Sequence, residues 1–308
     1  MKTIFFGTPV LAAECLKAAI DAGFDIVCVV TRADKPQGRG YVSAPSPVKV
    51  LAAENGIEVF QPEKLGEPQV AETLKSFGAE LFLTAAYGKI LPPEILSIPK
   101  KGAINIHASL LPKLRGPSPI NRALLGGDKI GGVSLMYMDE SMDTGDVILR
   151  LPMEIPDDMD FSKYSGELAV LGGKALKFLY NALKNEPGDR LPAEKQDHTG
   201  ATYAKKITKE EMVLDFTQPA ALNYNKVRAL SPSPCARTTV AGRMCKIYKA
   251  ELKSGRFSPS RPGRIVSADK NGIEIECGDG SLVITELRPS GKNKMSASAF
   301  ILGNIIER

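Results

Sequence analysis

The chain has 308 residues, of which 43% are hydrophobic and 24% charged, and both fractions are ordinary for a folded globular protein. No stretch approaches the roughly 18 apolar residues that a membrane-spanning helix needs, so the composition argues against a disordered or a membrane-embedded chain. The apolar run Ile4 to Phe6 is too short for the core of a signal peptide. We therefore expect a cytoplasmic protein, and the length favours a large domain followed by a small one.

Strand and helix patterns alternate at the start of the chain. We predict a strand at 3–6, the turn Gly7-Thr8-Pro9, a helix at 12–22 that stops at Gly23, and a strand at 26–30. Such an opening implies a parallel sheet with helices on both faces. The next residues, 34–47, are rich in Pro and Gly and carry Lys35 and Arg39, so we predict a long functional loop. It ends at Ser46-Pro47, an N-cap and first-turn proline for another helix.

The alternation continues, and it predicts a Rossmann-like, doubly wound, mostly parallel sheet in an α/β domain. The further elements are strands at 58–60, 81–85 and 103–106, a helix at 70–77, a hairpin-like pair at 132–138 and 146–153, and a helix at 165–184. Residues 189–208 have little periodicity and are interpreted as a linker between a domain of residues 1–188 and one of residues 209–308.

Short strands separated by Gly, Asn-Gly and Asp-Gly turns fill the last hundred residues. They are predicted at 237–240, 245–250, 263–267, 273–277 and 281–287, after a helix at 220–230. This spacing predicts a small β-barrel, either OB-like or SH3-like, and we favour the oligonucleotide-binding form.

Positive charge is concentrated in the same part of the chain. Residues 1–200 hold 22 Lys and Arg against 25 Asp and Glu, whereas residues 201–308 hold 18 against 10, a net of +8. A net positive module that carries Lys205, Lys206, Lys209, Lys246 and Lys249 could bind phosphates of a nucleic acid, although many basic faces are merely solvated.

Metal chemistry has little support. The five cysteines are scattered without the two-residue spacing of metal or redox sites, and only His107 and His198 could supply imidazole ligands. We predict no bound metal and interpret the cysteines as small apolar side chains.

Three polar residues are candidates for catalysis. Asn105 and His107 lie two apart at the end of a predicted strand, so their side chains can converge on one atom at the sheet edge where α/β proteins bind ligands. The amide could hold a carbonyl oxygen that gains negative charge, and the imidazole could move a proton. Asp143, in a Gly-containing turn, could orient His107. Each residue also has a structural interpretation, as a core histidine, a strand-end cap or a turn residue.

Two motifs carry a family resemblance. The run NIHASLLPKLRGPSPINRA at 105–123, followed by MDTGD at 142–146, resembles the folate-dependent formyltransferases. The segments FFGTP at 5–9 and TAAYGKILP at 84–92 are similar to the same family, and the loop KPQGRG with PSPVK resembles its branch that acts on methionyl-tRNA. The likeness extends to KMSA at 294–297, but residues 228–234 lack a tryptophan often found there.

The resemblance implies roles for individual residues. Asn105, His107 and Asp143 would form the catalytic trio, and 10-formyltetrahydrofolate, the formyl donor, would bind the loop of Ser109, Leu110, Leu111 and Pro112. Tyr87 and Leu91 would line the pterin pocket. Initiator methionyl-tRNA would be contacted by Arg39, Lys35, Lys205, Lys206 and Lys209. The expected enzyme is a monomer that formylates the α-amino group of methionine for translation initiation.

Other functions remain open from the sequence. A family member that formylates glycinamide ribonucleotide or an aminosugar would share the trio, as would a formyltetrahydrofolate hydrolase. A non-catalytic nucleic-acid-binding module would explain the charge but not Asn105, His107 and Asp143.

Overall fold

A computed structural model of the chain describes residues 1–37, 42–186, 188–253 and 261–305. It divides into two compact units that are each built from several stretches of sequence. The N-terminal unit contains Met1–Pro119, Ile130–Glu154 and Ser165–Ala204, and the C-terminal unit contains Ile120–Lys129, Ile155–Tyr164 and Lys205–Arg308.

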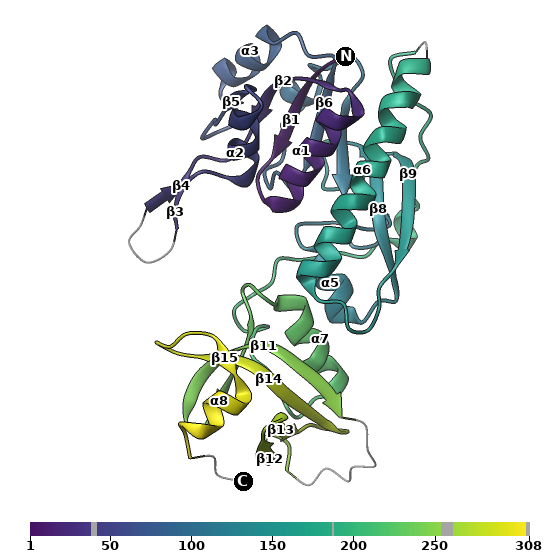
Figure 1. Cartoon of the computed structure of the whole chain (residues 1–308). Helices are drawn as coiled ribbons and strands as arrows, with labels where there is room; N and C mark the ends of the chain where they lie inside the picture. Colours follow the sequence, from purple (N-terminus) through teal and green to yellow (C-terminus); the bar gives the residue numbers. More distant parts are fainter. Residues whose placement is uncertain (38–41, 187, 254–260, 306–308) are drawn as a thin grey trace. The chain divides into compact units, whose positions relative to one another are not determined.

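The N-terminal unit is built on a seven-stranded sheet with the order β5-β2-β1-β6-β7-β8-β9 (Figure 1). Its strands are β1 Lys2–Gly7, β2 Asp25–Val30, β5 Glu58–Phe60, β6 Leu81–Ala85, β7 Ala103–His107, β8 Ile130–Tyr137 and β9 Val147–Glu154. The pairs among the first five strands in this order are parallel, whereas β7 with β8 and β8 with β9 are antiparallel. The predicted doubly wound, mostly parallel sheet and its hairpin are therefore confirmed.

Helices cover both faces of this sheet, as predicted. They are α1 Val10–Ala22, α2 Pro47–Glu54, α3 Pro68–Ser76, α4 Pro93–Leu96 and α6 Phe161–Asn185. Helix α1 ends where Gly23 adopts a φ of +102°, and α2 begins at Ser46, whose hydroxyl accepts a hydrogen bond from the Lys49 amide at 3.1 Å. The end of α1 and the start of α2 therefore lie where Gly23 and Ser46-Pro47 predicted them.

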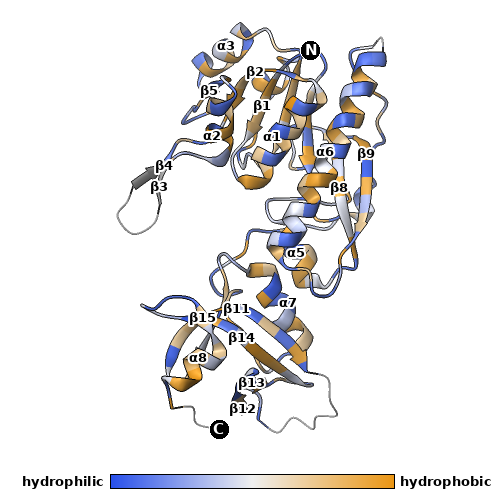
Figure 2. Ribbon diagram, viewed as in Figure 1, coloured by the Kyte–Doolittle hydropathy of each residue, from blue (hydrophilic) through white to orange (hydrophobic). Residues whose placement is uncertain are grey.

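The central strands are buried on both sides, which explains their nearly continuous apolar sequences (Figure 2). On one face, side chains of α3 and α4 join Ile4, Phe6 and Phe82 in one core cluster. On the other face, Gly172 of α6 lies close to Cys15 of α1 and to Ile106 of β7. Strand order reverses beside β1, so the carboxyl ends of β1 and β6 flank the point where such sheets bind ligands.

The segment predicted as a long loop contains a two-stranded ribbon, β3 Lys35–Gln37 with β4 Val42–Ala44. Its base is fixed by Lys49, whose ammonium group donates to Asp34 at 2.6 Å and to Gln61 at 2.8 Å. The sequence did not show these strands, because the segment is rich in Pro and Gly, which are uncommon in strands.

The C-terminal unit contains an antiparallel sheet with the order β10-β11-β14-β13-β12, and β15 pairs with β14. Its elements are α7 Ala220–Leu230, β10 Ala236–Val240, β11 Arg243–Lys253, β12 Ile265–Asp269, β13 Gly272–Glu276, β14 Ser281–Pro289, β15 Met295–Ser296 and α8 Ala297–Leu302. All five predicted strands are present, and β11, which pairs with β10 and with β14, is the longest of them. The path between β10 and β12 is open among the described strands, as in a partly open OB-like barrel.

Candidate active site

The catalytic candidates lie at the carboxyl end of β7. Strand β7 runs parallel to β6, with Asn105 opposite Thr84, and antiparallel to β8, with His107 opposite Ser134. Both side chains are buried, Asn105 at 9% exposure and His107 at 6%. Two buried polar side chains at the end of a sheet strand need hydrogen-bond partners, and the turn before β9 supplies one of them.

Asp143 contacts both residues. Its Oδ1 atom accepts a hydrogen bond from Asn105 Nδ2 at 3.4 Å and lies 3.7 Å from His107 Nδ1. Its Oδ2 atom accepts from the Gly116 amide at 2.7 Å. Asp143 itself has a φ of +56°, a conformation that Asp tolerates better than most residues. The structure thus brings Asn105, His107 and Asp143 together around one carboxylate.

The other ring nitrogen of His107 is engaged as well. His107 Nε2 lies 3.0 Å from the carbonyl oxygen of Leu114, and because a carbonyl only accepts, Nε2 is the donor. The nitrogen that faces Asp143, Nδ1, is therefore the position at which His107 can gain or lose a proton. Leu114 presents its carbonyl from a φ of +58°. Sequence reasoning missed this group, because every residue carries a carbonyl.

The loop predicted to bind folate is held by its backbone. Ser134 Oγ donates to Ser109 O at 2.7 Å and accepts from the Leu111 amide at 3.1 Å, and Arg150 Nε donates to Leu111 O at 2.6 Å. The side chains of Ser109 and Leu111 are buried, whereas Leu110 and Pro112 are partly exposed. Of these four predicted residues, Leu110 and Pro112 therefore offer the side-chain surface of the loop.

Tyr87 and Leu91 lie in the core cluster shared by β1, β6, α3 and α4, and each is 1% exposed. The Tyr87 ring contacts Phe6 edge to face at 5.6 Å between centroids. Burial raises the pKa of Tyr87 to about 12, so its hydroxyl stays protonated. Within the described residues this hydroxyl has no hydrogen-bond partner. A role in a pterin pocket stays a prediction.

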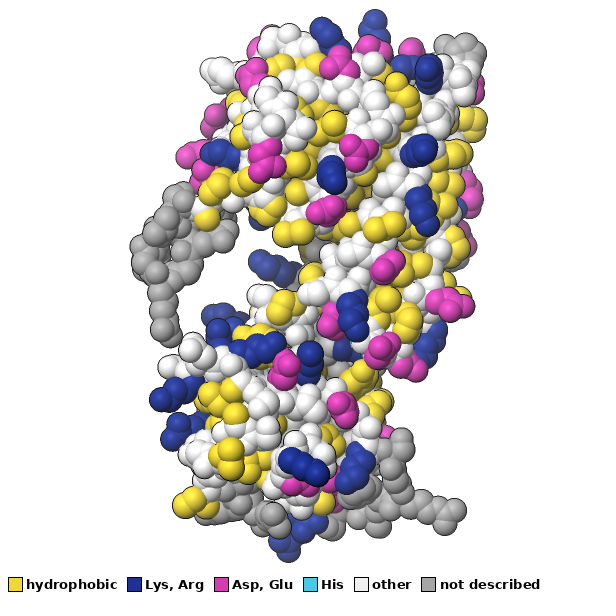
Figure 3. All heavy atoms as spheres, in the orientation of Figure 1, with side chains coloured by type: hydrophobic (Ala, Val, Ile, Leu, Met, Phe, Trp, Pro, Cys, Tyr) yellow, Lys and Arg dark blue, Asp and Glu magenta, His cyan; other side chains and the backbone are white. Residues whose placement is uncertain are grey.

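The residues predicted to contact tRNA are separate from the trio in sequence. Lys205, Lys206 and Lys209 are exposed in the C-terminal unit, where Figure 3 shows other Lys and Arg side chains as well. Arg122, which the sequence did not single out, donates to the carbonyls of Lys205 and Lys206 and forms an ion pair with Glu211 at 2.6 Å. Lys35 begins β3, and Arg39 lies outside the described residues.

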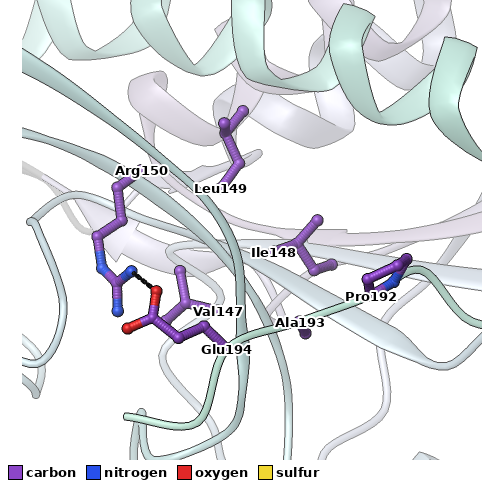
Figure 4. A pocket seen from close by; sticks show the side chains of 7 residues that line it. All are labelled: Val147, Ile148, Leu149, Arg150, Pro192, Ala193 and Glu194. Carbon is purple, nitrogen blue, oxygen red and sulfur yellow. Dashed lines mark hydrogen bonds and ion pairs between the residues drawn. The ribbon is translucent and has the colours of Figure 1, made fainter. Parts of the chain in front are cut away.

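A groove lies between β9 and residues 192–194 (Figure 4). It is lined by Val147, Ile148, Leu149, Arg150, Pro192, Ala193 and Glu194. Arg150 forms an ion pair with Glu194 at 2.8 Å, and the backbones of Val147 and Glu194 exchange two hydrogen bonds of 2.8 Å. Because no member of the trio lines this groove, we do not assign it to catalysis.

In the parts of the chain that the structure describes, no group of three or more His, Cys, Asp or Glu side chains could hold a metal ion. Over the same residues, no helix is long and apolar enough to cross a membrane.

Two family models match this chain. The "Formyl transferase" family model matches residues 1–177, and "Formyl transferase, C-terminal domain" matches residues 206–304. Methionyl-tRNA formyltransferase of Symbiobacterium thermophilum is 41% identical over 308 residues, covering 100% of this chain and 94% of its own. The protein of the same name from Caldanaerobacter subterraneus is 41% identical over 307 residues, covering 99% and 98%.

A solved structure shows the same fold at much lower identity. HypX from Aquifex aeolicus in complex with tetrahydrofolic acid is 18% identical with a TM-score of 0.65, and the match covers 98% of this chain but 47% of HypX. The sequence relatives, by contrast, match from end to end at 41% identity. The chain therefore belongs to the methionyl-tRNA formyltransferase family.

Proposed function

We propose that this chain transfers a formyl group from 10-formyltetrahydrofolate to the α-amino group of methionine on initiator methionyl-tRNA, and that Asn105, His107 and Asp143 carry the transfer. The observation that carries the residue assignment is the convergence of the three side chains around the Asp143 carboxylate. They lie at the carboxyl end of a sheet strand, the edge at which open α/β sheets bind ligands.

The amine nitrogen attacks the formyl carbon, and a tetrahedral intermediate with a negatively charged oxygen forms. Asn105 Nδ2 has two hydrogens and gives one to Asp143, so the second is available to that oxygen. His107, when its Nδ1 carries a proton, adds a positive charge that the Asp143 carboxylate stabilises. The bond from carbon to the folate nitrogen then breaks.

The proton released by the amine has to reach the leaving folate nitrogen. His107 Nδ1, or a water held by Asp143, is placed to accept it and pass it on, because Nε2 is already committed to Leu114. A covalent intermediate on sulfur has no support, since all five cysteines are buried. Burial raises the pKa of both Cys15 and Cys28 to about 12, which keeps these thiols protonated.

Folate binding is proposed at residues 109–112, with Tyr87 and Leu91 lining the pterin pocket. The fixed backbone of the loop supports this proposal, because a preorganised loop loses little conformational entropy on binding. A structure of HypX contains tetrahydrofolic acid and shares the fold.

tRNA binding is proposed for Lys35, Arg39, Lys205, Lys206 and Lys209 and for the basic C-terminal sheet. The net charge of +8 in residues 201–308 supports it. The names of the full-length relatives agree with a tRNA substrate. The division into a catalytic domain of residues 1–188, a linker of residues 189–208 and a tRNA-binding domain of residues 209–308 belongs to the same proposal, as do a monomeric state and a cytoplasmic location.

One assay tests the proposed function. The full chain is incubated with 10-formyltetrahydrofolate and, in parallel, with methionyl-tRNA, glycinamide ribonucleotide, an aminosugar nucleotide or water alone as the acceptor. We expect transfer to methionyl-tRNA only, and we expect His107→Ala to abolish it while the protein stays folded. Faster transfer to either small amine would contradict the substrate assignment, and full activity of the variant would contradict the site.

A further inference from the structure

A buried polar pair lies directly behind the trio. Arg115 is 1% exposed and Gln196 is 5% exposed. Arg115 donates from Nε and Nη2 to the side-chain oxygen of Gln196, at 3.0 and 2.7 Å, and from Nη1 to Nδ1 of His198 at 3.2 Å. A guanidinium buried this deeply requires such partners, because burying an unpaired charge is very unfavourable.

The other end of Gln196 binds the turn that carries Asp143. Its side-chain nitrogen donates to the carbonyl oxygen of Asp143 at 2.9 Å and to that of Gly145 at 2.7 Å. The amide oxygen accepts twice from Arg115 and the amide nitrogen donates twice, so the hydrogen-bonding capacity of the side chain is filled. Gln196 therefore fixes the backbone of the Asp143 turn relative to Arg115.

Arg115 in turn lies between two residues whose backbones contact the trio. The carbonyl of Leu114 accepts from His107, and the amide of Gly116 donates to Asp143. Leu114 and Gly116 have φ values of +58° and +118°, and the first is unfavourable for a leucine. Such a backbone persists only where its surroundings hold it. The Arg115 side chain supplies an anchor between these two residues.

We propose that Gln196, acting with Arg115, is a positioning residue for formyl transfer. It holds the Asp143 turn and the 114–116 loop to each other, and so sets the separation between the Asp143 carboxylate and His107 Nδ1. Among the described residues its side chain has no hydrogen bond to the side chains of the trio. It acts through the carbonyls of Asp143 and Gly145 and through the Arg115 guanidinium. This inference rests on the proposed roles of Asn105, His107 and Asp143.

Two substitutions distinguish the contribution of the Gln196 amide oxygen from that of its amide nitrogen. Gln196→Glu keeps an acceptor for Arg115 and adds an ion pair, but it leaves the carbonyls of Asp143 and Gly145 facing a carboxylate. Gln196→Ala removes both ends. For each full-length variant, kcat and the two KM values are measured with 10-formyltetrahydrofolate and methionyl-tRNA across a range of pH.

For both variants we expect kcat to fall about 10- to 100-fold, since small errors in the placement of catalytic groups are costly. Both KM values should stay within about three-fold, because the substrate-binding groups are not altered. The pH profile of kcat should also shift, because the distance between Asp143 and His107 influences the protonation of the imidazole.

Tyr137→Phe is the matched control. The Tyr137 hydroxyl accepts from the Leu191 amide at 2.7 Å, so it anchors the chain five residues before Gln196 and does not bind Gln196 itself. This variant should lose stability without a change in kcat or in the pH profile. Thermal unfolding and binding of tetrahydrofolate report whether each variant is folded.

His107→Ala, assayed in parallel, distinguishes failure of the positioning role of Gln196 from failure of the proposed catalytic trio. If it loses activity while both folded Gln196 variants keep the wild-type kcat and pH profile, only the positioning role is wrong. The same conclusion follows if the Gln196 variants lose activity only in proportion to their loss of folate binding. If His107→Ala is fully active, the trio and the positioning role fall together.

Discussion

The proposed catalytic edge of the N-terminal unit and the basic residues at 205–209 in the C-terminal unit use polar side chains in opposite ways. Asn105 and His107 are buried, and hydrogen bonds to fixed groups define their directions. Lys205, Lys206 and Lys209 are exposed on a segment whose backbone, not its ammonium groups, is held by Arg122. The first region depends on geometry and the second on charge, so substitutions in the two regions should change different quantities.

The largest effect should come from the catalytic edge. Asp143→Asn keeps the size of the side chain but removes the charge beside His107, so we expect kcat to fall by about 100- to 10,000-fold. The KM for methionyl-tRNA should change little. Asp139→Asn is the control, because this exposed carboxylate of the same turn binds Thr144 and Ser141 and does not contact the trio. Equal losses in both variants would mean that the turn, not the Asp143 charge, matters.

The basic segment should respond differently. Changing Lys205, Lys206 and Lys209 together to Ala should raise the KM for methionyl-tRNA and reduce the slope of log affinity against log salt by about 2 to 3, since each lysine neutralises one phosphate. The kcat at saturating tRNA should be unchanged. A control with the same charge loss replaces Lys174, Lys177 and Lys184, which are exposed on α6. If the control variant changes the KM for methionyl-tRNA and its salt dependence equally, tRNA binding depends on net charge and not on Lys205, Lys206 and Lys209.

A substitution beside the loop proposed to bind folate should give a smaller change. A Cβ on Gly132 would collide with the carbonyl of Leu151 and would lie 2.7 Å from a Leu110 methyl group. Gly132→Ala should therefore displace the loop, raise the KM for 10-formyltetrahydrofolate several-fold and destabilise the protein by about 1–3 kcal/mol. Gly166→Ala is the control, because its Cβ would meet nothing within 4 Å on helix α6. An unchanged folate KM in Gly132→Ala would remove this loop from the folate site.

The smallest predicted effect concerns the C-terminal unit, which contains a buried carboxylate on Glu274. Burial acts to raise the pKa of Glu274, but hydrogen bonds from Lys253, Ser281 and Ser267 outweigh it and lower the pKa below its ordinary 4.5. A lowered pKa stabilises the fold above the unfolded pKa, and this contribution is lost as the pH falls through the folded value.

Glu274→Gln should therefore cost about 1 kcal/mol at neutral pH and flatten the loss of stability below about pH 5. Chemical unfolding at several pH values measures both, and activity should be unchanged. Glu251→Gln, an exposed position on β11, is the control. If Glu274→Gln loses stability below about pH 5 as the wild type does, Glu274 does not govern the pH dependence of the unfolding free energy.

Regular elements were predictable where one pattern dominated. The alternation of apolar runs with helix caps predicted β1, α1, β2, β6 and β7, and the turn residues predicted the five strands of the C-terminal sheet. The short elements α4, α5 Pro119–Gly126, β15 and α8 were missed, because none is longer than eight residues and each has too few turns or pairs to show a period. Sequence also gave no sign that 120–129 and 155–164 belong to the C-terminal unit.

The sequence by itself determined the alternating fold, the charge of the C-terminal part and the three polar residues of the candidate site, since these depend on side-chain type and spacing. Tertiary structure alone decided that Leu114 O binds His107, that Gly116 N binds Asp143, and that Gln196 joins the two segments. The physical reason is that backbone groups are the same at every position, and a hydrogen bond such as that between Arg115 and Gln196 spans 81 residues, beyond the reach of any local pattern.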